Sequence, residues 1–188
     1  MHLRKLRVDG FKGFAVPFEI NFAPGLNVLL GENGTGKTAV VDAIRLLLQG
    51  NDPERADFSD TSFYRPFSEG AKSVDRVTIS ARFSELTDEE QIAFLPWTDL
   101  GSEATLSLQV ENKLTPRGRY KRTLWGGASS STVFEWDLMD TINCAYLPPL
   151  RDAEARLGKC RHASAARTTG ARRGSWSSGL AVFSELGD

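Results

Sequence analysis

Residues 31–38 follow the pattern G-x-x-x-x-G-K-[ST], which binds the phosphates of nucleotides. Gly34 and Gly36 permit backbone conformations that turn amide N–H groups toward a phosphate, and a following helix N-terminus adds partial positive charge. Lys37 reaches the β- and γ-phosphates, and the Thr38 hydroxyl is a Mg²⁺ ligand. The motif therefore predicts a site for ATP and Mg²⁺. Its residues are Gly31, Glu32, Asn33, Gly34, Thr35, Gly36, Lys37 and Thr38.

The segments on either side of this loop support the prediction. The apolar run at residues 26–30 predicts a buried strand that enters the loop, and residues 37–49 predict a helix with a broad apolar face. Strand, loop and helix in this order are what a phosphate-binding loop requires. The alternative is a glycine-rich turn that carries a Lys-Thr pair by chance.

The rest of the chain indicates an antiparallel β region. Strands are predicted around Leu6 and Val8 and at 18–22, 77–83, 105–111, 119–125 and 142–147. Thr87 is the predicted N-cap of a short helix that ends near Phe94, before Pro96.

Composition excludes several classes of protein. The chain has 188 residues, is 40% hydrophobic and has a net charge of −1, which suits one domain with an appendage and excludes a wholly basic nucleic-acid binder. No apolar run approaches the roughly 20 residues of a membrane span, so we expect no membrane association. Two cysteines cannot form a disulfide framework, and the expected location is the cytoplasm.

The opening of the chain resembles the N-terminal lobe of ABC-type ATPases. The resemblance lies in residues 6–14, in the loop 31–38 and in the Val-Asp-Ala-Ile at 41–44. It points to the branch of RecF, the structural-maintenance-of-chromosomes (SMC) proteins and the overcoming-lysogenization-defect (OLD) nucleases. It implies an incomplete α/β P-loop NTPase of the ABC (RecF/SMC-like) type with an antiparallel β lobe. Lys12 matches a basic residue that lies near the nucleotide in relatives; a solvated turn lysine is the alternative.

A second stretch, Tyr-Leu-Pro-Pro-Leu-Arg-Asp-Ala-Glu at 146–154, resembles a segment of OLD-family ATPases. The resemblance then covers residues 1–157. These divide into a P-loop lobe (1–50), a connection (51–76), an antiparallel β lobe (77–135) and a strand with its following segment (142–157).

The OLD resemblance implies the ATP-binding lobe of an ATP-dependent DNA endonuclease or DNA-repair ATPase. DNA and a second head in a homodimer are the implied partners. Two alternatives are a RecF/SMC-like repair ATPase without nuclease activity and a small P-loop kinase. The kinase requires a doubly wound parallel sheet.

Three motifs of the intact relatives are not found in the sequence: a Walker B strand ending in Asp-Glu, an ABC signature and an acidic Toprim nuclease domain. Residues 158–188 include a basic stretch without apolar periodicity and are expected to form a disordered or frame-shifted tail. The hypothesis is a truncated reading frame. We therefore expect the chain alone neither to turn over ATP nor to cut DNA.

Basic residues gather in two places, and both are candidates for contact with DNA phosphates. Arg4, Lys5 and Arg7 lie near the N-terminus, and a second group lies on the predicted hairpin. A solvated, charged strand face is the preferred interpretation of both groups.

Overall fold

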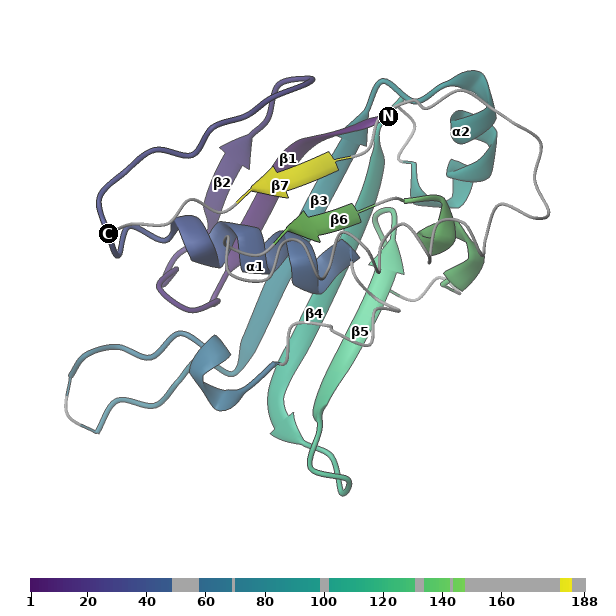
Figure 1. Cartoon of the computed structure of the whole chain (residues 1–188). Helices are drawn as coiled ribbons and strands as arrows, with labels where there is room; N and C mark the ends of the chain where they lie inside the picture. The colour runs from purple at the N-terminus through teal and green to yellow at the C-terminus, as the bar shows by residue number, and fades with distance from the viewer. Residues whose placement is uncertain are drawn as a thin grey trace.

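The computed structural model describes residues 1–48, 58–68, 70–98, 102–130, 134–142, 144–147 and 180–183. Within these residues, five antiparallel strands form one sheet in the order β2-β1-β3-β4-β5, and the helix α1 (Lys37–Leu48) packs against it (Figure 1). The strands are β1 (His2–Asp9), β2 (Phe18–Asn21), β3 (Arg76–Ser84), β4 (Ala104–Leu114) and β5 (Tyr120–Gly126). Each of these five strands was predicted from its sequence pattern.

Buried side chains alternate with partly covered ones along much of β3. In β3, Val77 and Ile79 are fully buried, whereas Thr78 between them is only partly covered. The register sets Val8 of β1 opposite Ile79, and Ile79 opposite Leu108 of β4, so apolar side chains line up across three strands. This alignment makes a continuous apolar face, because side chains at matching register positions point to the same side of a sheet.

Helix α1 covers this apolar face. Eight of its twelve residues are buried, and it contacts β1, β3 and β4 of the sheet. Asp42 and Arg45 are only half-buried and provide the polar side of the helix. The predicted amphipathic helix is thus confirmed over residues 37–48.

Short helices lie in the connections between the longer elements. The helix α2 (Asp88–Ala93) begins after Thr87, whose side chain accepts a hydrogen bond from the Glu90 backbone N–H while the Glu90 carboxylate accepts one from the Thr87 N–H. This capping box confirms the predicted N-cap. The described residues also include 3₁₀ helices at Asp60–Ser62, Leu95–Trp97 and Trp136–Thr141.

Gly126 at the end of β5 allows Trp97 to pack directly on the strand. A Cβ at position 126 would lie 2.0 Å from the indole ring of Trp97. Trp97 is fully buried and stacks on Phe134, with ring centroids 5.3 Å apart. Only glycine permits so close an approach of ring to backbone.

The predicted strand at residues 26–30 is wrong for this structure. These residues form no strand, and Leu26, Val28 and Leu30 are 82%, 63% and 81% exposed. No described strand pairs with the segment. An apolar run becomes a buried strand only when neighbouring strands supply hydrogen-bond partners and cover, and the described part of the chain provides neither here.

The C-terminal region contains a strand where the sequence predicts disorder. The strand β7 (Leu180–Phe183) pairs in parallel with β6 (Cys144–Leu147), the latter corresponding to the strand predicted at 142–147. Four consecutive apolar residues favour the extended conformation of β7. Residues 148–179 and 184–188, which hold the rest of the predicted tail, lie outside the described residues.

The sheet joins strands from two of the predicted segments. β1 and β2 lie in the predicted P-loop lobe, and β1 pairs with β3 of the predicted antiparallel β lobe; the division of the chain into these segments stays a prediction. Among the described residues, no helix has both the length and the apolar character needed to cross a membrane.

Candidate nucleotide-binding site

The predicted phosphate-binding loop opens directly into α1. Gly34 and Gly36 have φ angles of +86° and +94°, which L-residues with a Cβ rarely adopt. The Val40 N–H donates to the Gly36 carbonyl at 3.0 Å and closes the first turn of the helix. Asn33 and Thr38 are exposed, so both side chains are open to solvent. The geometry is that of a tight loop at a helix N-terminus, which attracts anions.

Lys37 folds back over this loop. Its Nζ donates hydrogen bonds to the carbonyl oxygens of Gly31 at 2.5 Å and Glu32 at 2.9 Å. The Thr35 hydroxyl donates to the same Glu32 carbonyl at 2.9 Å. The ammonium group therefore lies against the backbone of the loop at Gly31 and Glu32.

An aromatic contact attaches this loop to the turn after β1. A Cβ at Gly36 would lie 3.1 Å from the ring of Phe14, so that ring packs on the glycine. Phe14 stacks in turn on Phe18 of β2, with ring centroids 4.6 Å apart. The turn that carries Lys12 is thereby held against the loop.

Lys12 forms an ion pair with Asp42, one helical turn beyond Thr38. Its backbone has a φ of +48°, and its N–H donates to the Ser62 carbonyl at 2.8 Å. Arg45 also contacts Asp42, at 3.4 Å. The structure thus brings Lys12 to the helix of the loop. Asp42, which the sequence analysis gave only as part of the segment 41–44, and Arg45, which it did not name, lie beside it. The three-residue spacing of Asp42 and Arg45 on the helix was the available signal.

The basic residues of β1 are neutralised by partners. Arg4 pairs with Glu103 at 2.6 Å, and Lys5 and Arg7 pair with Glu19 at 2.5 and 3.3 Å. The hydrogen bond from Lys5 holds the pKa of the Glu19 carboxyl below its usual range. These pairs favour the interpretation of β1 as a charged, solvated strand face.

The hairpin of β4 and β5 carries the second group of basic residues. Lys121 pairs with Glu111 at 2.8 Å, while Arg117 and Arg119 at the tip are exposed.

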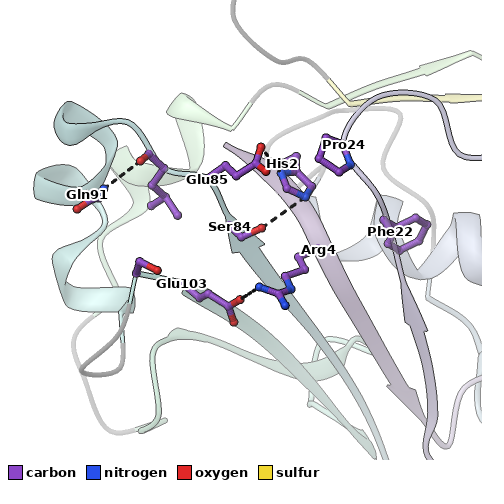
Figure 2. Close-up of a pocket in the computed structure, with 10 residues that line it drawn as sticks. His2, Arg4, Phe22, Pro24, Ser84, Glu85, Gln91 and Glu103 are labelled. Atoms are coloured by element: carbon purple, nitrogen blue, oxygen red, sulfur yellow. Dashed lines mark hydrogen bonds and ion pairs between the residues drawn. The ribbon is translucent and has the colours of Figure 1, made fainter.

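A groove with a volume of about 490 Å³ lies away from the loop, where β1, β3 and α2 meet (Figure 2). None of its lining residues belongs to the sequence 31–38. In Figure 2, Arg4 points to Glu103 and Ser84 to His2, whose Nε2 lies 3.4 Å from the serine hydroxyl. The polar groups of the groove contact one another, and the described residues contain no cluster suited to hold a metal ion.

Comparison with known proteins identifies the family. A family model described as an AAA domain matches residues 5–124. The chromosome partition protein Smc of Halothermothrix orenii is 50% identical over 48 residues, which make up 26% of this chain and 4% of that protein. The DNA replication and repair protein RecF of Mesorhizobium japonicum is 39% identical over 61 residues, 32% of this chain and 16% of that protein.

Among solved structures, the SMC head domain from Thermotoga maritima is 19% identical with a TM-score of 0.47, over 87% of this chain and 51% of that one. The chain thus matches only a small part of the length of these curated relatives. Because the AAA-domain model spans well over half of the 188 residues, the chain belongs to the AAA domain family, and its described residues form an antiparallel sheet beside the loop at 31–38.

Proposed function

We propose that this chain forms the ATP-binding lobe of a cytoplasmic DNA ATPase of the RecF and SMC type. The observation that carries the proposal is the loop at residues 31–38, which leads into α1 with two glycines of positive φ and whose backbone carbonyls accept hydrogen bonds from the Lys37 ammonium. The similarity of the N-terminal residues to Smc and RecF proteins supports the same assignment.

The loop residues fit a nucleotide with its magnesium ion. The backbone N–H groups around Gly34 and Gly36 cradle the phosphates, and the α1 N-terminus adds its partial positive charge. Lys37 exchanges the carbonyl oxygens of Gly31 and Glu32 for phosphate oxygens, which are better acceptors because they are charged. The exposed Thr38 hydroxyl holds Mg²⁺, which neutralises phosphate charge when it is bound.

The exposed apolar run before the loop supports the proposal that this lobe belongs to a larger head. Leu26, Val28 and Leu30 are exposed, and no strand of the described residues pairs with them, although the sequence is typical of a strand buried within a sheet. We infer that further strands of the intact protein cover it, and that turnover of ATP, DNA binding and pairing of two heads require that complete protein.

An OLD-type DNA endonuclease is the second candidate. The observation in its favour is the segment that begins at Tyr146 in β6 and resembles the OLD family in sequence. The Smc and RecF relatives favour the first candidate. The small kinase is disfavoured, because the five-stranded sheet is antiparallel and not doubly wound.

Replacing Lys37 by alanine tests the proposed function. Lys37→Ala should weaken Mg-ATP binding at least about tenfold, because a charge-assisted contact worth roughly 1.5–3 kcal/mol is lost. Isothermal titration calorimetry on the whole chain measures the affinity. Lys121→Ala, which removes a lysine from the distant hairpin, is the matched control and should bind as the unmodified chain does. Equal affinity of Lys37→Ala and the unmodified chain would contradict the proposed site.

A further inference from the structure

Three features hold the turn that carries Lys12 in place. The left-handed backbone of Lys12, its hydrogen bond to Ser62 and the packing of Phe14 on Gly36 hold the turn against the phosphate-binding loop. The backbone at residue 12 is therefore set before any nucleotide arrives. Only the flexible four-carbon side chain of the lysine remains adjustable.

Asp42 determines where that side chain now points. It lies four residues after Thr38 on α1, so both side chains emerge on the same face of the helix, one turn apart. The Oδ2 atom of Asp42 accepts a hydrogen bond from the Lys12 ammonium. The Asp42 side chain is 17% exposed and the Lys12 side chain is 37% exposed. The ion pair holds Lys12 one turn behind the position proposed for the phosphates.

Arg45 is a second cation on the same carboxylate. Its Nη1 lies 3.4 Å from Oδ1 of Asp42, the oxygen that Lys12 does not use. The guanidinium carbon lies 3.8 Å from the centroid of the Tyr146 ring in β6, a cation–π contact that restrains it. Asp42 thus keeps a charged partner when Lys12 leaves, which avoids the large penalty of an unpaired, partly buried carboxylate.

We propose that Asp42 is a positioning residue that competes with the nucleotide for Lys12. In the nucleotide-free chain, the carboxylate holds the ammonium; a bound triphosphate draws it away, while Arg45 keeps Asp42 neutralised. A diphosphate lacks the terminal phosphate and leaves the ion pair intact. The inference rests on the proposed function, since it requires ATP to bind at the loop 31–38.

Neutralising Asp42 should release Lys12 and strengthen ATP binding. A ligand that must first break an ion pair binds more weakly by the strength of that pair. Asp42→Asn should therefore bind Mg-ATP roughly three- to fivefold more tightly, the range expected for a partly exposed ion pair, and should leave Mg-ADP affinity unchanged. Asp42→Glu retains the carboxylate and should restore the original ATP affinity.

Two further variants separate competition from a structural effect. In a Lys12→Ala background, Asp42→Asn should no longer change ATP affinity, because there is no lysine to release. Glu111→Gln removes a comparable ion pair on the distant hairpin and should change neither affinity. All affinities are measured by calorimetry with ATP and ADP in the presence of Mg²⁺.

Lys12→Ala alone tests the inference even if Asp42→Asn fails to fold. It should lower the preference for ATP over ADP by at least about threefold, since a charge-assisted phosphate contact is lost. An unchanged preference, or an Asp42→Asn variant that folds and binds ATP equally or more weakly, would overturn the inference. ATP binding that does not depend on Lys37 would instead overturn the proposed function.

Discussion

The strand β3 and the segment at residues 26–30 both present apolar side chains in the pattern of a buried strand, yet only one of them is buried. In β3, Val77 and Ile79 are fully covered, and the strand is paired on both sides, by β1 and β4. In the segment 26–30, Leu26 and Leu30 are more than four-fifths exposed, and no described strand lies alongside.

The difference shows that an apolar segment forms a buried strand only where neighbouring strands pair with it. Strand β1 is inserted between β2 and β3, so its hydrogen-bonding groups and its side chains are satisfied from both directions (Figure 1). The segment 26–30, which leads into the loop at residues 31–38, has no such neighbours among the described residues. Within the part of the chain that the structure describes, the sheet therefore supplies its own pairing partners, whereas the segment 26–30 presents an exposed apolar surface.

The largest expected effect comes from truncating equivalent leucines in the two regions. Leu6 in β1 is fully buried, whereas Leu30 is 81% exposed. Leu6→Ala should lower the free energy of unfolding by about 2–5 kcal/mol, because it leaves a cavity in the core. Leu30→Ala should change it by less than about 0.5 kcal/mol. Urea unfolding followed by circular dichroism measures both values. Similar losses at the two positions would mean that residues 26–30 are covered in solution and would break the comparison.

A smaller effect is expected from adding a methyl group to the glycines of the loop. Gly34 and Gly36 both have positive φ angles, so alanine at either position should cost about 1–2 kcal/mol of backbone strain. At Gly36 the new Cβ would also press on the Phe14 ring at 3.1 Å, whereas nothing lies within 4 Å at Gly34. Gly36→Ala should therefore lower the melting temperature more than Gly34→Ala.

Differential scanning calorimetry measures the melting temperatures of the two glycine variants and tests whether the loop packs on the turn after β1. A greater loss at Gly36 would show that the loop gains its rigidity from the turn after β1. Equal losses would indicate that the loop and this turn do not pack together in solution.

The smallest expected effect comes from replacing Glu19 in β2, the edge strand that precedes the segment 26–30. Lys5 lowers the pKa of Glu19 from its ordinary value of 4.5, so ionised Glu19 stabilises the folded chain. This contribution is fully present above pH 4.5 and is lost as the pH falls through the lower pKa of the folded state. Glu19→Gln should melt slightly below the unmodified chain at pH 7, and the difference should vanish in more acidic buffer. A difference that grows on acidification would contradict the assignment.

The sequence alone predicted the elements whose signals are local. The two-residue alternation in β3 and β4, the apolar face of α1 and the Thr87 capping box all act within a few residues, and each is present as expected. The phosphate-binding loop at residues 31–38 was predicted from the same kind of local signal, since its glycines and its lysine occupy neighbouring positions in the chain, and phosphate binding there stays a prediction.

Tertiary structure decided what depends on contacts between distant residues. The pairing of β1 with β3 joins residues about 70 to 80 positions apart, such as Asp9 with Thr78 and His2 with Ser84. The ion pair of Lys12 with Asp42 spans 30 positions, and the exposure of residues 26–30 depends on strands that the described chain does not supply. Local patterns specify how a segment tends to fold, whereas burial and hydrogen-bond pairing are set by whichever segments lie beside it, because both are properties of the contact and not of the segment.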